Sequence, residues 1–422
     1  MLARGNHDYT IMTKKHKKNT FTITMFTQTQ LQFLVLLRAG LWNKADIIDE
    51  LTHPKACQAH GNEVINQPID WTSIYRISRE QTVVGLIADA IGNLPPEQQP
   101  AKAIAQRFAI DKLNVERSHL KLNAVLNLVV GTMNEIGTRH VLLKGQGVAQ
   151  NYNSPTSRVC GDIDLYIGEA NYRKACEAIK DISDSGVPAS AETIKHASYI
   201  VKGIDIEIHR MTSTLDSNRC NKALQAWTQK ALDEEIKLEE GTKTLRKLET
   251  WDNGGTEIFL PEPNYNAIFL IIHMMRHLTS GGIGLRQCCD WTMFMHSHRG
   301  QLDEELIATK LHELGLEKAW NSIATLSVNY LGMPSNEIIA FTRREDKTAA
   351  KMLAIIFETG NFGKHDEAEK KAHDKHFVVH KWKRFRYHIG YFMKVLPLFP
   401  KMEIQYIIKW FFSGIRAAIK GL

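Results

Sequence analysis

Two aspartates separated by one residue lie in a short apolar run near the middle of the sequence. Asp162 and Asp164 alternate with Ile163 and Leu165, and such alternation is typical of a β-strand, in which side chains at i and i+2 share a face. Two carboxylates on one face repel each other and lose hydration when they are buried. The usual compensation is a hard divalent cation held by oxygen ligands. The pattern therefore indicates a metal site.

A second acidic run follows further along the chain. Asp205, Glu207 and His209 alternate with isoleucines at positions 204, 206 and 208, so their side chains also share one strand face. A carboxylate from this strand would complete a site for one or two Mg²⁺ ions, which in two-metal enzymes lie about 3.5–4 Å apart. Either Asp205 or Glu207 could supply it, because both point the same way. His209 is either a donor facing a ligand or a structural histidine.

A glycine-rich segment precedes both acidic runs. It consists of Lys144, Gly145, Gln146 and Gly147. A short apolar strand, 141–143, comes before it, and a helix is predicted from Val148 to about Tyr152. Glycines in such a turn let the backbone approach a phosphate, and a helix N-terminus offers unpaired N–H donors. With Arg158 as a further cation, we interpret this segment as a nucleotide-binding element.

The order of these segments resembles the nucleotidyltransferase superfamily of DNA polymerase beta. More narrowly, Leu-Leu-Lys-Gly-Gln-Gly at 142–147, Arg158 before Gly-Asp-Ile-Asp-Leu, and Ile-Glu-Ile-His-Arg at 206–210 resemble the family of uncharacterised bacterial nucleotidyltransferases. Asp70-Trp71 and residues 284–291 also resemble this family, so that the resemblance covers roughly residues 30–410. The superfamily usually has Gly-Ser after the first strand, whereas this chain has no serine there.

The resemblance implies a role for each of these residues. Asp162 and Asp164 would hold the Mg²⁺ that bridges an NTP triphosphate, with ATP as the default nucleotide. Glu207, two residues before the histidine as in the family, would hold the ion that activates an acceptor hydroxyl. The candidate supporting residues are Asp205, His209, His277 and Arg286. The implied fold is α+β, with a small mixed sheet flanked by N-terminal and C-terminal helical subdomains.

The composition is that of an ordinary globular chain. Of 422 residues, 43% are hydrophobic and 23% are charged, which is enough apolar material for about two or three domains. The net charge of +7 permits a nucleotide or RNA ligand but does not require one, because phosphate affinity needs clustered cations. The six cysteines form no C-x-x-C pair, so we expect a reducing, cytoplasmic setting.

Changes in periodicity and charge divide the chain into five predicted segments. They are a flexible basic leader (1–27), a helical subdomain (28–138), the nucleotidyltransferase core (139–260), a second helical subdomain (261–358), and a charged linker with basic and aromatic C-terminal helices (359–422). No secretory apolar run follows the basic residues of the leader, so we do not predict a signal peptide.

Within these segments the spacing of apolar residues predicts individual elements. Helices are expected at about 70–90, 97–136 as one helix or two, 170–184, 265–278 and 285–298, and three more over 301–358. Asp70 and Asn264 are predicted N-caps. A hairpin is expected from 199–202 to 204–209, turning at Lys202-Gly203. Residues 211–260 are predicted to be irregular, apart from a turn at 251–255 and a short strand at 257–260.

Two histidines and an arginine pair on the predicted helices leave alternatives open. His273 and His277 have a spacing used by zinc proteases, but the glutamate that such an enzyme needs beside the first histidine is missing. We expect His277 either to line the cleft or to be buried against the backbone. Arg286 and Asp290 stand four residues apart and are predicted to pair on a helix surface, or else to orient substrate.

The C-terminal segment and the acceptor also leave alternatives open. Basic residues interleaved with aromatics after residue 380 can indicate a membrane-surface helix or an RNA face. We favour helices that dock on the protein with basic outer faces, and no apolar run reaches membrane-spanning length. The acceptor could be a small molecule, a tRNA or a protein side chain. The alternative function is a catalytically inactive module that binds nucleotide, RNA or a partner at a membrane surface.

Overall fold

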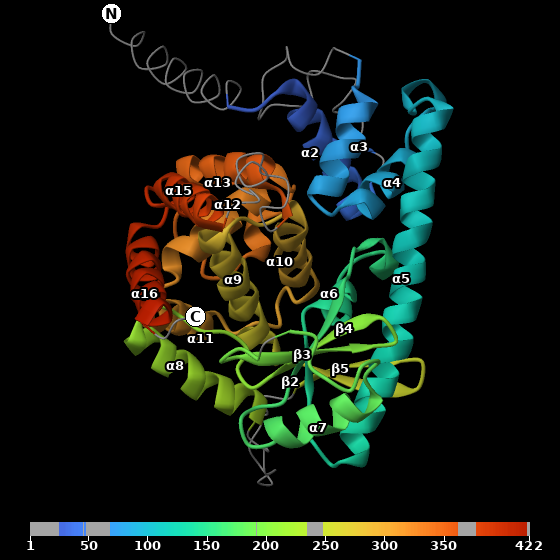
Figure 1. Ribbon diagram of the computed structural model, residues 1–422. Coiled ribbons are helices and arrows are strands. Elements are labelled where there is room, and N and C mark those ends of the chain that lie inside the picture. The colour runs from blue at the N-terminus through green and yellow to red at the C-terminus, as the bar shows by residue number, and fades with distance from the viewer. Residues whose placement is uncertain are drawn as a thin grey trace, which may run out of the picture.

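The structure is a computed structural model that describes residues 25–44, 46–47, 68–190, 192–233, 248–361 and 377–419, with side chains of the last range described for 386–411. Most of the predicted leader and linker therefore lies outside the described residues. A small mixed sheet lies among helices (Figure 1), so the predicted α+β class is confirmed.

The central sheet has four strands in the order β1-β2-β4-β3. The strands are β1 (Val141–Leu143), β2 (Asp162–Tyr166), β3 (His196–Val201) and β4 (Ile204–His209). β2 runs parallel to β4, while the pairs β1–β2 and β3–β4 are antiparallel. The predicted hairpin turn at Lys202-Gly203 is confirmed, and both residues have positive φ there.

The two faces of this sheet differ as the alternation predicts. Ile163, Leu165, Ile206 and Ile208 are fully buried in one core with apolar residues of two helices. These helices are α5 (Lys102–Glu135) and α7 (Tyr172–Ile182). The polar residues of β2 and β4 consequently lie on the opposite face, toward the C-terminal helices (Figure 1).

The N-terminal helices are joined to the sheet by α5, which is one helix of 34 residues. They are α2 (Gln28–Trp42), α3 (Trp71–Glu80) and α4 (Val84–Gly92). Asp70 caps α3 as predicted, accepting a hydrogen bond from the Ser73 backbone N–H. The prediction of one helix over 70–90 is wrong, because Thr82 adopts a φ of 55°, which no right-handed helix contains.

The region predicted to be irregular contains further elements. It holds α8 (Asn218–Thr228), a π-helical turn η4 (Gln229–Asp233) and a hairpin of β5 (Glu249–Asn253) and β6 (Thr256–Leu260). Only Gly254 and Gly255 form the turn, and the Asp252 carboxylate accepts a hydrogen bond from the Gly255 N–H at 2.7 Å. The side chain of Asn253 donates to the Asn123 carbonyl of α5. The strand predicted at 257–260 is thus confirmed as β6, while long-range packing stabilises β5, which has little apolar alternation of its own.

The C-terminal helices form a bundle against the polar face of the sheet. They are α9 (Pro263–Ser280), α10 (Leu285–Ser297), α11 (Glu304–Leu314), α12 (Glu317–Tyr330) and α13 (Asp346–Thr359). Short 3-10 turns occur at η2 (Pro96–Gln98), η3 (Pro155–Ser157) and η5 (Ser335–Glu337). The three helices predicted over 301–358 are confirmed. Glu262, rather than Asn264, caps α9, because Pro263 already occupies the first helical position.

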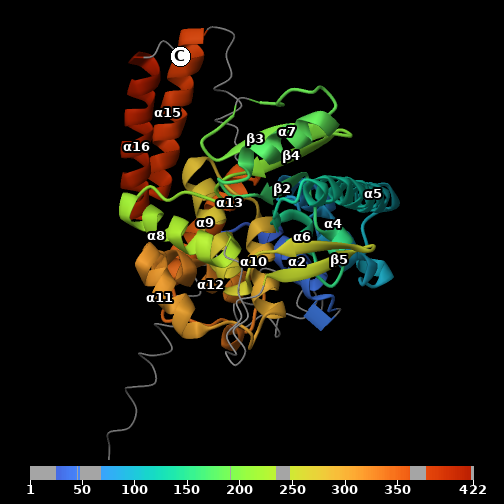
Figure 2. The same cartoon turned by 90° about the horizontal axis from the view of Figure 1, so that it is seen from below.

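Two long helices end the described chain and lie side by side (Figure 2). They are α15 (Phe377–Val395) and α16 (Pro400–Ile419). Glu403 of α16 is buried, while Ile404, Ile408 and Phe411 are about half exposed. The described outer surface of α16 therefore carries apolar side chains as well as lysines. Across the described residues, no helix is long and apolar enough to cross a membrane.

Candidate active site

Three carboxylates converge on the polar face of the sheet. The register of β2 and β4 places Asp164 opposite Glu207 and Asp162 opposite Asp205. Carboxylate oxygens of Asp162, Asp164 and Glu207 all lie within 4.8 Å of one another. Asp205 does not belong to this group, and one of its oxygens is buried without a hydrogen-bond partner among the described residues. The structure therefore brings together the triad that the sequence indicated.

The two aspartates have opposite electrostatic environments. The charge of Asp164 and burial raise the pKa of Asp162. Burial alone would raise the pKa of Asp164 too, but the charge of Lys144 and a hydrogen bond from His209 outweigh it and hold that pKa well below its usual range. Lys144 Nζ lies 3.0 Å from Asp164 Oδ2. Asp164 is thus a fixed anion, whereas the repulsion that raises the pKa of Asp162 is only partly offset by the charges of Lys144 and Arg286.

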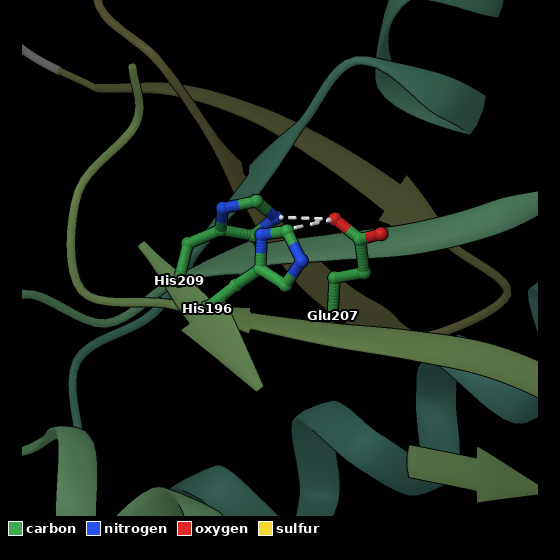
Figure 3. Close-up of side chains that lie close together, drawn as sticks. All are labelled: His196, Glu207 and His209. Carbon is green, nitrogen blue, oxygen red and sulfur yellow. Dashed lines mark ion pairs between the residues drawn. The ribbon is translucent and has the colours of Figure 1, made fainter. Parts of the chain in front are cut away.

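A pair of histidines borders the carboxylates (Figure 3). His209 Nε2 lies 3.0 Å from Asp164 Oδ1 and 3.0 Å from Glu207 Oε2. His196 of β3 approaches the same Glu207 oxygen at 3.6 Å through Nδ1. Burial would lower the pKa of His209, but its hydrogen bonds to Asp164 and Glu207 raise it. Burial lowers the pKa of His196.

Cationic and neutral groups from other segments face the carboxylates. Burial together with the charges of Arg276 and Lys144 lowers the pKa of Lys195 to about 8. Burial and the charge of Lys144 lower the pKa of His277 to about 3, and the same causes lower the pKa of His273. The two α9 histidines are therefore neutral at pH 7. Lys144 and Lys195 are the basic side chains best placed to meet an anionic ligand.

One family model matches the chain, over residues 67–332, and it is described as an uncharacterised nucleotidyltransferase. This range covers more than half of the 422 residues and contains the whole carboxylate cluster. The chain belongs to this nucleotidyltransferase family. Comparisons with curated proteins and with solved structures gave no match.

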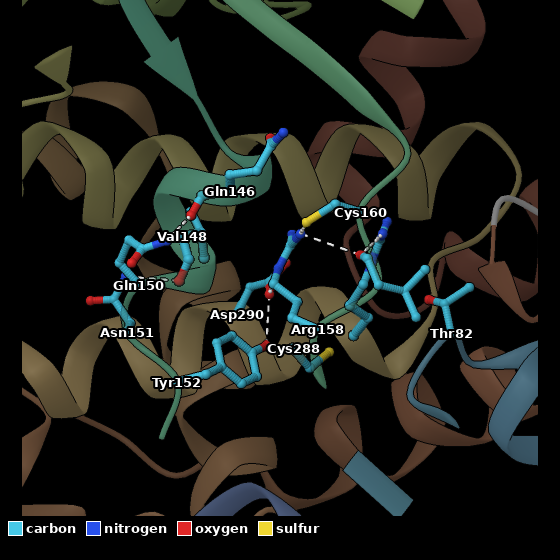
Figure 4. Close-up of polar contacts among 12 residues, drawn as sticks. Thr82, Gln146, Val148, Gln150, Asn151, Tyr152, Arg158, Cys160, Cys288 and Asp290 are labelled. Atoms are coloured by element: carbon cyan, nitrogen blue, oxygen red, sulfur yellow. Dashed lines mark hydrogen bonds and ion pairs between the residues drawn. The ribbon is translucent and has the colours of Figure 1, made fainter. Parts of the chain in front are cut away.

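Arg158 of this nucleotidyltransferase lies in a buried ion pair with Asp290 (Figure 4). Its Nε and a terminal nitrogen donate to the two oxygens of Asp290 at 2.6 and 2.7 Å. The remaining nitrogen contacts Cys160 Sγ at 2.9 Å, and the Tyr152 hydroxyl donates to Asp290 at 2.7 Å. Every nitrogen of this guanidinium thus has a protein partner, although the sequence suggested a nucleotide contact.

The predicted pairing of Arg286 with Asp290 is wrong. Arg286 instead donates to the Val159 carbonyl at 2.6 Å, because Arg158 already engages both oxygens of Asp290. Burial and the charge of Arg158 lower the pKa of Arg286. Its charge in turn acts to lower the pKa of Asp162, which puts Arg286 on the side of the cluster next to that aspartate.

The glycine-rich segment forms the first turn of a helix rather than a loop before one. The helix, α6, spans Gly145–Ala149, so the predicted start at Val148 is wrong. Gly145 has a φ of 50°. A side-chain carbon at Gly147 would lie 2.6 Å from Leu260 Cδ2, so any larger residue here would have to displace the Leu260 side chain on β6. The Gln146 amide is buried and has no hydrogen-bond partner among the described residues, which leaves it available to a ligand.

Lys195 and His196 were missed by the sequence analysis. The predicted first strand of the hairpin began at residue 199, whereas β3 begins at His196. The signal was present in the hairpin itself. When the strand pairing is followed backward from the turn at Lys202-Gly203, His196 lies opposite His209. Residues directly opposite in antiparallel strands are close neighbours.

Proposed function

We propose that this nucleotidyltransferase is Mg²⁺-dependent and transfers NMP from an NTP to an acceptor hydroxyl, releasing pyrophosphate. The convergence of Asp162, Asp164 and Glu207 within 4.8 Å of one another is the observation that carries the proposal. Opposed carboxylates from two parallel strands cost free energy unless a cation compensates them. The charge of Asp164 on the same strand, burial and the charge of Glu207 raise the pKa of Asp162, which supports the proposal that a cation is needed there.

The donor set fits Mg²⁺. All three side chains offer oxygen, which is the ligand that this hard cation prefers. Asp164 accepts hydrogen bonds from Lys144 and His209, yet a carboxylate has about four lone-pair positions, so each oxygen can still serve a metal. When bound, Mg²⁺ would offset the negative charge of the triphosphate and lower the pKa of an acceptor hydroxyl.

The chain's own residues would hold the nucleotide and orient the carboxylates. Lys144 and Lys195 supply positive charge toward the triphosphate, and Gln146 supplies an unpartnered amide. His209 donates through Nε2 between Asp164 and Glu207, which fixes both carboxylates against rotation. His273 and His277 stay neutral and so add no charge that would compete with the lysines for phosphate.

A thermal-shift titration tests the site before the acceptor is known. Each NTP is added with Mg²⁺ to the wild type, to Asp162→Asn/Asp164→Asn and to Asp181→Asn, which removes an exposed aspartate of α7 outside the site. A nucleotide at about 100 times its Kd stabilises by about 2.7 kcal/mol. We expect a Mg²⁺-dependent shift in the wild type and in Asp181→Asn that is absent in the double variant. Equal shifts in all three proteins would refute the proposal.

The transfer itself is tested with an NTP labelled at the α-phosphate. Incubation with a small-molecule panel, with tRNA and with total protein separates the three acceptor classes, and label retained on one of them identifies it. ATP is the nucleotide to try first. Pyrophosphate should appear in the same amount as the transferred label. Label transfer that persists in the double variant would contradict the assigned roles of Asp162 and Asp164.

A further inference from the structure

Next to the three carboxylates, two imidazoles and a carboxylate form a second group of potential ligands. His196, Glu207 and His209 come from the adjacent strands β3 and β4, and one ligand atom of each lies within 4.8 Å of the other two. Figure 3 shows both rings turned toward the Glu207 oxygen. Cross-strand pairing sets the arrangement, because His196 is directly opposite His209 and the ring centroids are 4.9 Å apart.

The 3.6 Å separation of His196 from Glu207 matches that between ligands of one ion, and the 3.0 Å separation of His209 from Glu207 is slightly shorter. His209 Nε2 and His196 Nδ1 lie 3.0 and 3.6 Å from Glu207 Oε2. Two ligands at about 2.0–2.2 Å from a metal at near-tetrahedral angles are separated by roughly 3.3–3.6 Å. His196 Nδ1 is buried, and 3.6 Å is too long for a hydrogen bond, so it has no hydrogen-bond partner among the described residues. A cation between these three atoms would satisfy it.

We propose that His196, Glu207 and His209 form a second metal site, selective for a borderline divalent cation such as Zn²⁺ or Co²⁺. Imidazole nitrogen is a ligand that such ions accept readily, whereas Mg²⁺ prefers oxygen. The site shares Glu207 with the carboxylate cluster, so an ion bound there lies beside the other cluster. It does not depend on nucleotidyl transfer, and it would exist in an inactive protein of the same fold.

Binding of this ion changes the hydrogen bonds of the site. His209 Nε2 cannot both bind a metal and donate a proton to Asp164, so occupation of the second site releases Asp164 Oδ1. Lys144 would remain on Asp164 Oδ2. The two states of His209, donor and ligand, therefore couple the borderline ion to the charge of the aspartate pair.

Co²⁺ binding tests the proposal without any measurement of activity. The metal-free full-length protein is titrated with Co²⁺ in a large excess of Mg²⁺, and the visible absorption of four-coordinate or five-coordinate Co²⁺ is recorded. We expect one ion to bind with that absorption. In His196→Gln the affinity should fall at least tenfold, whereas His312→Gln, which removes an exposed histidine of α11, should match the wild type. Equal Co²⁺ binding in His196→Gln would overturn the proposal.

Two further measurements keep the outcome independent of folding and of the proposed function. X-ray absorption at the cobalt edge of the wild-type complex should show two imidazole ligands, and a spectrum of oxygen ligands alone would overturn the site even if His196→Gln fails to fold. Asp162→Asn should retain the Co²⁺ absorption while it loses the Mg²⁺-dependent nucleotide shift. Loss of both would mean that Co²⁺ occupies the carboxylate cluster, against the proposal.

Discussion

Removing the guanidinium of Arg158 should destabilise the fold rather than weaken nucleotide binding. In the native protein the side chains of Arg158 and Asp290 are only 5% and 7% exposed, respectively. In Arg158→Met the carboxylate of Asp290 would remain buried. Of the contacts that now satisfy Asp290, the hydrogen bond from the Tyr152 hydroxyl would persist. The variant therefore leaves a buried charge with a single partner.

The size of the effect follows from this geometry. Breaking a buried pair by removing one partner costs about 3–5 kcal/mol, because the remaining charge is uncompensated. Removing both charges, in Arg158→Met/Asp290→Leu, should cost much less than Arg158→Met alone, since well-packed apolar replacements of buried pairs are often neutral. Tyr152→Phe, which deletes one hydrogen bond to a charged group, should cost about 1.5–3 kcal/mol.

Urea unfolding of the wild type, these three variants and Asp290→Leu provides the assay. Because each single variant leaves the other charge buried, the double-variant cycle between positions 158 and 290 should give a coupling energy of at least about 3 kcal/mol. The Mg²⁺-dependent nucleotide shift of each folded variant is measured in parallel. A stability loss below about 1 kcal/mol in Arg158→Met, together with a clear loss of nucleotide affinity, would refute this reasoning and support the nucleotide contact that the sequence suggested.

Three further predictions concern charge and packing elsewhere. Because the pKa of Lys195 is lowered to about 8, this side chain loses its charge as the pH rises through that value. In a binding titration, NTP affinity at pH 9 should be up to about tenfold weaker than at pH 7, and Lys195→Arg should flatten this pH dependence. Burial and the charge of Asp216 raise the pKa of Glu403 to about 8, so the folded state binds more protons than the unfolded state between pH 4.5 and 8. The free energy of unfolding should therefore fall as the pH rises through this window, and urea unfolding of Glu403→Gln should not show the fall. A side-chain carbon at Gly40 would lie 1.9 Å from a backbone oxygen of α4, whereas one at Gly131 of α5 would meet nothing within 4 Å. Gly40→Ala should therefore lower the melting temperature, and Gly131→Ala should raise the free energy of unfolding by about 0.5–1 kcal/mol.

The carboxylate cluster could be predicted because its signal is local. Alternation within a few residues identifies a strand face, and the parallel pairing of β2 with β4 then brings Asp164 and Glu207 together. The hairpin of β3 and β4 was predictable for the same reason, since one turn fixes its register. His196 was missed only because the predicted strand began at residue 199, whereas β3 begins at His196. The side chains that contact the carboxylates of the cluster thus follow from strand geometry.

Other features of the fold and the site could not be predicted, because they depend on contacts between segments that are distant in the sequence. Arg158 finds Asp290 across 132 positions of sequence, and no local pattern distinguishes it from an arginine that faces a phosphate. Strand β5 carries few apolar residues and is held by α5 through Asn253. The start of α6 at Gly145 contradicts the low helix propensity of glycine, because the position after β1 and the packing of Gly147 on Leu260 decide it.

The long helix α5 makes this protein intolerant of changes in length at one place. Its first half is attached to the N-terminal helices, through Lys112 to Asp89 and through Asp111 to Tyr75, while its second half packs on the apolar face of the sheet. One inserted residue between these attachments would rotate one half about 100° relative to the other and lengthen the helix by about 1.5 Å. Natural and engineered insertions should therefore be accepted in the connecting loops, and deletions or insertions within residues 112–122 should be rejected.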